Sequence, residues 1–297
     1  LANSLRAMQK RLSQWPSTQT IFYKADGSSY QPGETLKQTD LANTLSAIAK
    51  KGSSAFYQGP IAQQISDSVR DAGGIMTMQD LASYTAIERK PVTGDYRGYQ
   101  VISMPPPSSG GIHIVQMLNM LSQFPIDKMG HNSAATIHVM AESMRRAYAD
   151  RSLYLGDPDF VNVPVAALTN KQYAKQLVSQ INSSKATPSS EVSPGTLLPY
   201  ESNQTTHYSV VDKFGNAVSN TYTLNFSYGS GLVANGTGVL LNNEMDDFSA
   251  KPGTPNAYGL IGGKANAVAA KKRPLSSMTP TIVLKDNKPY LVTGSPG

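Results

Sequence analysis

The chain has 297 residues, of which 39% are hydrophobic and 15% charged, a composition typical of a folded globular protein. It contains no run of roughly 20 apolar residues that could span a membrane, and residue 1 does not begin a signal-peptide pattern. The net charge of +6 comes from 26 Lys and Arg spread thinly along the chain, which argues against nucleic-acid binding. The absence of cysteine excludes disulfides, thiolate metal sites and cysteine nucleophiles.

The first half of the chain predicts helices separated by loops. In chain order, the predicted elements are helices over residues 40–51 and 60–72, a strand over 99–103, a helix opened by the segment 105–111, and a helix over 133–150. Thr39 is expected to cap the first helix, and Pro60 suits the first turn of the second. The apolar spacing places Leu41, Leu45 and Ile48 on one face of the first helix, and Ile114, Met117, Leu118 and Leu121 on the apolar face of the third.

The second half predicts strands. Residues 182–203 are rich in Ser, Thr, Pro and Gly, which is typical of a mobile linker. The pattern then predicts a strand over 206–211, a turn over 212–216, a return strand over 217–225, a Gly-rich loop over 228–238, and a hairpin of 281–284 with 290–292. Helices first and strands after the linker indicate an α+β fold. Because residue 1 lies inside an amphipathic pattern and residue 297 directly follows a strand, both ends are expected to be cuts through a longer protein.

Common catalytic and cofactor motifs are missing from the sequence. The four histidines show no metal-ligand spacing, so each is expected to be structural. Thr293 replaces the first glycine that a Gly-x-Ser-x-Gly nucleophile elbow requires. Residues 229–234 match Gly-x-Gly-x-x-Ala, but Asn235-Gly236 follow, so no helix can begin there to hold a pyrophosphate. The sequence therefore predicts neither a metal nor an organic cofactor.

The first hairpin of the second half predicts a polar cluster. If Val211 and Ala217 flank the five-residue turn as a pair, Thr205 lies opposite Thr223, with the two Cβ atoms roughly 5 Å apart. Asn225 is expected one pleat beyond Thr223, on the same face. The register also pairs His207 with Thr221 and Ser209 with Ser219.

Two interpretations of this cluster are open from the residues alone. Threonine favours strands, so the cluster could be an exposed, Thr-rich strand face. Alternatively, cleavage of the preceding linker would make Thr205 an N-terminal nucleophile. Its own α-amine, with a reference pKa of about 7.7–8.0, would then serve as the base.

Ordered motifs along almost the whole chain resemble those of γ-glutamyltranspeptidases of the bacterial type, also called glutathione hydrolases. The motifs after the linker are residues 205–212 (TTHYSVVD), 223–225 (TLN), 242–248 (NNEMDDF), 273–278 (RPLSSM) and 294–297 (GSPG). Those before it are residues 57–60 (YQGP), 106–111 (PPSSGG), 150–151 (DR) and 156–158 (GDP).

The resemblance implies an N-terminal-nucleophile hydrolase, an αββα four-layer sandwich made as a self-cleaving proenzyme. Cleavage is expected between Gln204 and Thr205. Residues 1–204 would then belong to the large subunit and residues 205–297 to the small subunit, within one folding domain overall. Thr205 would be the nucleophile, its amine the base, and Thr223 the hydroxyl that orients it.

The resemblance also assigns the two ends of a γ-glutamyl substrate. Asn225, Glu244 and Asp247 would accept hydrogen bonds from the α-ammonium, with the Asp247 carboxylate as the strongest partner. Ser276 and Ser277 would donate to the α-carboxylate.

Two further elements of the family's site are expected at Gly297 and Tyr258. Gly297 would be the first of two glycines whose backbone N–H groups stabilise the oxyanion. Tyr258 would close over the site as part of a lid formed by residues 252–263 and reach Asn225. The second glycine and the family's carboxylate-binding arginine fall outside this sequence.

The resemblance implies glutathione and other γ-glutamyl compounds as donors, and water, amino acids or dipeptides as acceptors. It also implies a periplasmic or secreted location, no nucleic-acid partner, and large and small subunits from one precursor. Two alternatives remain: a cephalosporin-acylase-like amidohydrolase of the same fold, and a non-catalytic, uncleaved homologue acting as a binder.

Overall fold

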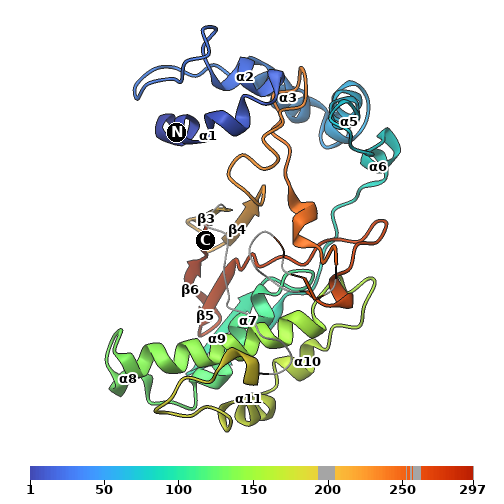
Figure 1. Ribbon diagram of the computed structural model, residues 1–297. Helices are drawn as coiled ribbons and strands as arrows, with labels where there is room; N and C mark the ends of the chain where they lie inside the picture. The colour runs from blue at the N-terminus through green and yellow to red at the C-terminus, as the bar shows by residue number, and fades with distance from the viewer. Residues whose placement is uncertain (193–204, 252, 255, 257–261, 297) are drawn as a thin grey trace. The chain divides into compact units, whose positions relative to one another are not determined.

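The computed structural model describes residues 1–192, 205–251, 253–254, 256 and 262–296. Gln204, Tyr258, Gly297 and residues 193–203 of the predicted linker lie outside the described residues. The chain forms two compact units (Figure 1): unit 1 contains residues 1–88 and 226–243, and unit 2 contains residues 89–225 and 244–297. This division rests on folded contacts, whereas the predicted division at residue 204 concerns a covalent cut and stays a prediction.

Unit 1 is a set of helices around an inserted loop. Its helices are α1 (Ala2–Leu12), α2 (Pro16–Phe22), α3 (Thr39–Lys51), α4 (Ser54–Tyr57), α5 (Pro60–Asp71) and α6 (Met78–Ser83). Residues 226–243 run among these helices (Figure 1). The buried Thr18 hydroxyl donates to the Gly231 carbonyl at 2.8 Å and accepts from the Val233 N–H at 2.9 Å. Tertiary hydrogen bonds of this kind hold the Gly-rich loop in place.

Helix α3 differs from its prediction in two details. Thr39 is its first helical residue and Gln38 occupies the cap position, so the predicted cap was wrong by one residue. Leu45 is 56% exposed, and the buried residue of this helix is Thr44. The Thr44 hydroxyl donates to the Thr237 carbonyl at 2.8 Å. The helix therefore packs against a polar loop backbone, and this packing favours a hydroxyl at position 44, which does not belong to the apolar spacing.

Unit 2 contains a four-stranded antiparallel sheet, ordered β1-β2-β5-β6. The strands are β1 (Val92–Tyr96), β2 (Tyr99–Ser103), β5 (Thr281–Lys285) and β6 (Lys288–Thr293), so the predicted strand at 99–103 and hairpin at 281–292 are confirmed. Pairing of β2 with β5 joins segments about 180 residues apart, with Val101 opposite Val283.

Helices cover one face of this sheet. The helices of unit 2 are α7 (Gly110–Leu121), α8 (Ile126–Met129), α9 (Ala134–Tyr154), α10 (Val165–Leu168) and α11 (Lys171–Val178), with short 3₁₀ turns η1 (Ser189–Glu191), η2 (Glu244–Asp247) and η3 (Lys264–Asn266). Helix α7 packs on β1 and β2, and α9 and α11 pack on α7 (Figure 1). The main core consists of Val92, Ile112, Val115, Leu155, Leu168 and Leu275.

The fully buried face of α7 is not the predicted one. The predicted stripe is only half-buried: Ile114, Met117, Leu118 and Leu121. The buried positions are Gly110, Gly111, Ile112, His113, Val115, Gln116, Asn119 and Met120. Two of the buried side-chain amides there donate hydrogen bonds: Gln116 Nε2 to the Asp150 carboxylate at 2.5 Å, and Asn119 Nδ2 to the Thr169 carbonyl at 2.8 Å.

Helix α9 is longer than predicted. Ser133 caps it, and its hydroxyl accepts from the Thr136 N–H at 3.2 Å, but the helix continues past Asp150 to Tyr154. The additional turn contains Arg151, which is buried. A helix with buried charges has no simple apolar stripe, which explains why its end was missed.

The remaining strands, β3 (Thr205–Val211) and β4 (Ala217–Thr223), form a separate two-stranded sheet. Its register is the predicted one, with Val211 opposite Ala217 and Thr205 opposite Thr223. One face packs against β6, where the Ser219 hydroxyl donates to the Thr293 carbonyl at 2.8 Å. The other face exposes Tyr208, Val210, Val218 and Tyr222. Unit 2 is thus layered as helices, sheet and sheet, and the α+β prediction is confirmed.

The contact between the two sheets requires a glycine after β6. A Cβ atom at Gly294 would lie 2.2 Å from His207 Cε1, so only glycine permits this approach. The His207 ring in turn contacts the hydroxyls of Thr221 at 2.8 Å and Ser209 at 3.0 Å. These contacts give His207 a structural role, as predicted.

Candidate active site

Thr205 is the first residue of β3 and is half-buried. Its backbone N–H donates to the Pro296 carbonyl at 2.8 Å. Cleavage before Thr205 would convert this backbone nitrogen into a free α-amine. The nitrogen that would act as the base is therefore already held in place by the Pro296 carbonyl.

Thr223 faces Thr205 across the hairpin and is linked to Asn225. The Asn225 backbone N–H donates to the Thr223 hydroxyl oxygen at 3.0 Å. Because that oxygen accepts this bond, its own proton remains able to donate to another group. We name Thr205, Thr223 and Asn225 the nucleophile group.

Asn225 departs from the predicted geometry. Strand β4 ends at Thr223, and Asn225 has a left-handed backbone with a φ of 71°. Asn225 therefore does not continue the strand, and the prediction that it lies one pleat beyond Thr223 was wrong. A turn follows instead, and asparagine tolerates this region better than most residues. Asn225 is nevertheless buried.

Residues 226–243 belong to unit 1, so the chain leaves unit 2 after Asn225 and re-enters it at Glu244. A hydrogen bond joins the two ends of this segment: the Phe226 N–H donates to the Asn243 side-chain oxygen at 2.9 Å. Asn225 precedes Phe226 and Glu244 follows Asn243, so this hydrogen bond brings the backbone at Asn225 close to the backbone at Glu244.

Glu244 and Asp247 are the first and last residues of η2, and their carboxyl groups share a hydrogen bond. In a 3₁₀ turn, side chains three residues apart eclipse, so this spacing brings the two acids together. Burial, followed by the charge of Asp247 and their shared hydrogen bond, raises the pKa of Glu244 to about 8. Burial also raises the pKa of Asp247, but the bond from Glu244 and the Arg151 charge oppose that rise. Glu244 therefore keeps its proton at neutral pH, and its hydrogen bond favours the ionised form of Asp247.

Ser276 and Ser277 lie in an irregular segment that pairs with residues 107–109 through an isolated parallel bridge between Ser276 and Ser108. The Ser276 N–H donates to the Pro107 carbonyl at 2.9 Å, and the Ser109 N–H donates to the Ser276 carbonyl at 2.8 Å. The hydroxyl of Ser276 accepts from the Met278 N–H at 3.1 Å. The backbone of this segment is therefore fixed, while Ser276 and Ser277 are half-buried.

Two residues of this region were not predicted to act in the site: Arg151 and Asn266. Arg151 donates from Nη2 to the Ser277 hydroxyl and from Nε to the Ser109 hydroxyl, each at 3.2 Å. Asn266 donates to the Asp247 carbonyl at 2.7 Å and accepts from the Leu275 N–H at 3.0 Å. The Asp150-Arg151 motif was a visible signal for the arginine, whereas Asn266 had none.

The two acids, the two serines and Arg151 form a second cluster, which we name the charged group: Glu244, Asp247, Ser276, Ser277 and Arg151. Arg151 joins its two halves, since it bonds to Ser277 and its charge acts on Asp247. Of the predicted site residues, Gln204, Tyr258 and Gly297 lie outside the described part of the chain.

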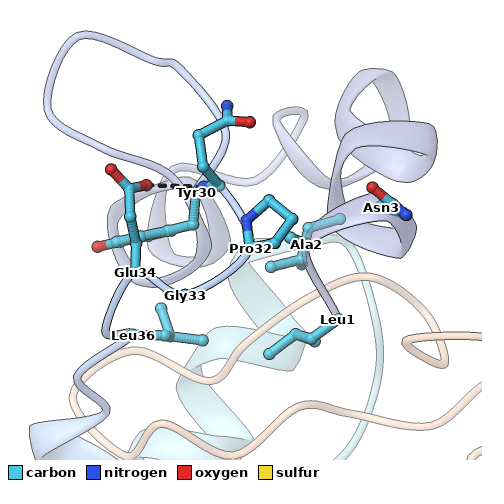
Figure 2. A pocket seen from close by; sticks show the side chains of 10 residues that line it. Leu1, Ala2, Asn3, Tyr30, Pro32, Gly33, Glu34 and Leu36 are labelled. Atoms are coloured by element: carbon cyan, nitrogen blue, oxygen red, sulfur yellow. Dashed lines mark hydrogen bonds between the residues drawn. The ribbon is translucent and has the colours of Figure 1, made fainter.

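A pocket of about 360 Å³ lies elsewhere, in unit 1 (Figure 2). It is lined by the start of α1 and by residues 30–34 and Leu36. None of the predicted site residues that the structure describes lines it, so it contributes nothing to this site. Across the described residues, no cluster of three or more potential metal-ligating side chains occurs, and no helix is sufficiently long and apolar to cross a membrane.

Comparisons with known proteins give a consistent family. The model of the gamma-glutamyltranspeptidase family matches residues 1–297. The glutathione hydrolase proenzyme of Escherichia coli K12 is 62% identical over 281 residues, covering 95% of this chain and 48% of the relative. The chain spans about half the length of the curated relatives it matches.

Solved structures agree with the sequence comparison. The Helicobacter pylori gamma-glutamyltranspeptidase has a TM-score of 0.64 and 46% identity, over 66% of this chain and 56% of that one. The cephalosporin acylase from Bacillus halodurans has a TM-score of 0.77 and 25% identity, over 97% of this chain and 50% of that one. The predicted N-terminal-nucleophile sandwich class is therefore confirmed, and the chain belongs to the γ-glutamyltranspeptidase family.

Proposed function

We propose that this chain is part of a self-cleaving enzyme that hydrolyses γ-glutamyl amide bonds or transfers the γ-glutamyl group. The observation that carries the proposal is the pairing of a nucleophile group with a charged group in one unit. A γ-glutamyl substrate has a reactive amide at one end and an α-ammonium and α-carboxylate at the other. Hydroxyls in the first group and opposite charges in the second match these two ends.

Maturation begins at the Gln204–Thr205 bond. The Thr205 hydroxyl oxygen attacks the Gln204 carbonyl carbon, the C–N bond breaks, and the nitrogen takes up the hydroxyl proton. Water then hydrolyses the resulting ester, which releases the Gln204 carboxylate and leaves Thr205 with a free α-amine and a free hydroxyl. This order makes one oxygen serve both reactions.

In the catalytic cycle, the Thr205 oxygen attacks the γ-carbonyl carbon of the substrate while the α-amine takes its proton. The amine returns the proton to the departing amino group, and a γ-glutamyl ester forms. Water or an acceptor amine then attacks this ester. Thr223 would orient the nucleophile with its remaining hydroxyl proton, and the Pro296 carbonyl would hold the amine.

The charged group would bind the amino-acid end of the substrate. Asp247 and Glu244, with Asn225, would accept from the α-ammonium, since their shared negative charge complements it. Ser276 and Ser277 would donate to the α-carboxylate. By family resemblance, Gly297 would supply one oxyanion N–H and Tyr258 would close the site.

The proposed substrates are glutathione and related γ-glutamyl compounds, with amino acids, dipeptides or water as acceptors, and the proposed location is periplasmic or secreted. A second candidate, a cephalosporin-acylase-like amidohydrolase, is favoured by the TM-score of 0.77 to such an enzyme. The charged group argues against it, because Asp247, Ser276 and Ser277 suit an acyl group that ends in an amino acid, with both an ammonium and a carboxylate.

Two measurements test this proposal in the protein as its gene encodes it. Intact mass should show two pieces that meet between residues 204 and 205; a single uncleaved species would favour the non-catalytic binder. Release of p-nitroaniline from γ-glutamyl-p-nitroanilide should far exceed release from glutaryl-p-nitroanilide, which lacks the α-ammonium. The reverse preference would support the acylase alternative.

A further inference from the structure

Arg151 occupies a special position in the charged group. It lies in the last turn of α9 and is 6% exposed. Its guanidinium divides its donors between two segments: Nη2 donates to the Ser277 hydroxyl and Nε to the Ser109 hydroxyl, each at 3.2 Å. The same positive charge lowers the pKa of Asp247 against the effect of burial.

These two hydrogen bonds determine the direction of the serine hydroxyls. A guanidinium can only donate, so both serine oxygens must accept from it. The Ser109 proton then goes to the Ser276 carbonyl, to which its hydroxyl donates at 3.0 Å. The proton of Ser277, by the same logic, must point away from Arg151 toward a different acceptor.

We propose that Arg151 is a positioning residue that makes Ser277 a donor to the substrate α-carboxylate and supplies the positive potential for that carboxylate. This inference rests on the proposed γ-glutamyl activity. Arg151 acts through Ser277 and through its charge, without itself taking part in the bond-making steps. It would therefore determine specificity for acyl groups that carry an α-carboxylate.

Arginine suits this position better than lysine. The planar fork presents Nε and Nη2 in fixed directions, which allows one side chain to hold two serines on different segments. A lysine would keep the charge but has one compact ammonium on a flexible stem. His113, beside Arg151, does not add a second charge at neutral pH, because burial and the Arg151 charge lower its pKa to about 3.

The decisive experiment compares two substrates in Arg151→Lys. One is γ-glutamyl-p-nitroanilide; the other is 4-aminobutyryl-p-nitroanilide, which keeps the amine and chain but lacks the α-carboxylate. We expect kcat/KM for the first to fall about tenfold to a hundredfold, mainly through KM, because a contact to a charged group is lost. For the second it should change less than about threefold. The ratio of kcat/KM for the first substrate to kcat/KM for the second should therefore fall strongly.

A double-mutant cycle tests whether Arg151 acts through Ser277. If it does, Arg151→Lys combined with Ser277→Ala should cost little more than the larger single effect. Ser109→Ala, which removes one acceptor and keeps the arginine, should raise KM for the γ-glutamyl substrate by a smaller factor. This variant tests the inference even if the arginine variants fold poorly.

Arg146→Lys is the matched control. Arg146 lies on the same helix, is also buried, and pairs with Glu142 at 2.6 Å, but it contacts neither serine. It should lower the melting temperature and leave the substrate ratio unchanged. Parent-like ratios in Arg151→Lys and Ser109→Ala, in an active parent enzyme, would overturn this inference alone. A parent enzyme inactive on both substrates would overturn the proposed function with it.

Discussion

The nucleophile group and the charged group are built in different ways. Thr205, Thr223 and Asn225 belong to one hairpin and the turn after it, and they contribute hydroxyls and an amide. The charged group includes residues from η2, from the segment 276–277 and from α9, and it places two acids and an arginine in a partly desolvated region.

This difference corresponds to two tasks. The proposed chemistry needs a hydroxyl and an amine held in fixed positions, which a strand pair supplies through local geometry. Recognition of a zwitterion needs opposite charges kept apart and out of water, where electrostatic interactions are stronger. Only distant segments packed together can provide such an environment. The predictions below separate the two tasks, beginning with the largest expected effect.

Thr205→Ala should abolish both cleavage at residue 204 and γ-glutamyl turnover, because one hydroxyl oxygen serves both reactions. Mass spectrometry and p-nitroaniline release measure the two outcomes. Thr206→Ala is the matched control, since Thr206 is exposed and points to the other face of β3. Normal cleavage in Thr205→Ala would end the assignment of the nucleophile.

Asp247→Asn should impair the charged group without affecting the nucleophile group, because it removes the proposed ammonium partner and leaves the hairpin intact. We expect kcat/KM for γ-glutamyl-p-nitroanilide to fall about tenfold to a hundredfold, equivalent to about 1.5–3 kcal/mol. Cleavage of the precursor should proceed at the parental rate, since that reaction involves no substrate ammonium. Parental kcat/KM would contradict the ammonium site.

Glu244→Gln should change the pH dependence of KM. Glu244 keeps its proton below about pH 8, while the substrate ammonium favours the ionised acid. In the parent, KM should therefore fall as pH rises toward 8, by up to about tenfold per unit. The Gln variant cannot ionise and should show a flatter profile. A slope identical to the parent's would assign the titration to another group, such as the Thr205 amine.

The same group gives a signed prediction for stability. The pKa of Glu244 rises from 4.5 to about 8 on folding, so between these values the folded protein binds more protons than the unfolded chain. The free energy of unfolding should therefore decrease as pH rises through this window. Thermal melting of Glu244→Gln across pH 5–8 should show a smaller decrease than the parent.

The smallest effect is expected in the segment that connects the two groups along the chain. Thr18→Val leaves the Val233 N–H and the Gly231 carbonyl without their buried partner, which should cost about 1–3 kcal/mol of stability. Thr20→Val is the control, because Thr20 is exposed and bonds only within its own helix, to Pro16. Equal melting temperatures for both variants would show that the loop anchor is unimportant.

The sequence by itself determined features that depend on neighbouring residues. The β3–β4 register, with Thr205 opposite Thr223, follows from period-two alternation and a five-residue turn. The second hairpin and the start of the helix near residue 133 follow from equally local signals. Ordered motifs also indicated the family along nearly the whole chain.

Only the tertiary structure decided which faces are buried and which charges meet. Thr44 rather than Leu45 is buried because its hydroxyl finds a carbonyl 193 residues away. Arg151 reaches Ser109 and Ser277 across 42 and 126 residues, so no local pattern could assign it to the site. Hydrogen-bond partners and counter-charges come from distant segments. Their effect on burial and pKa exists only once those segments have packed together.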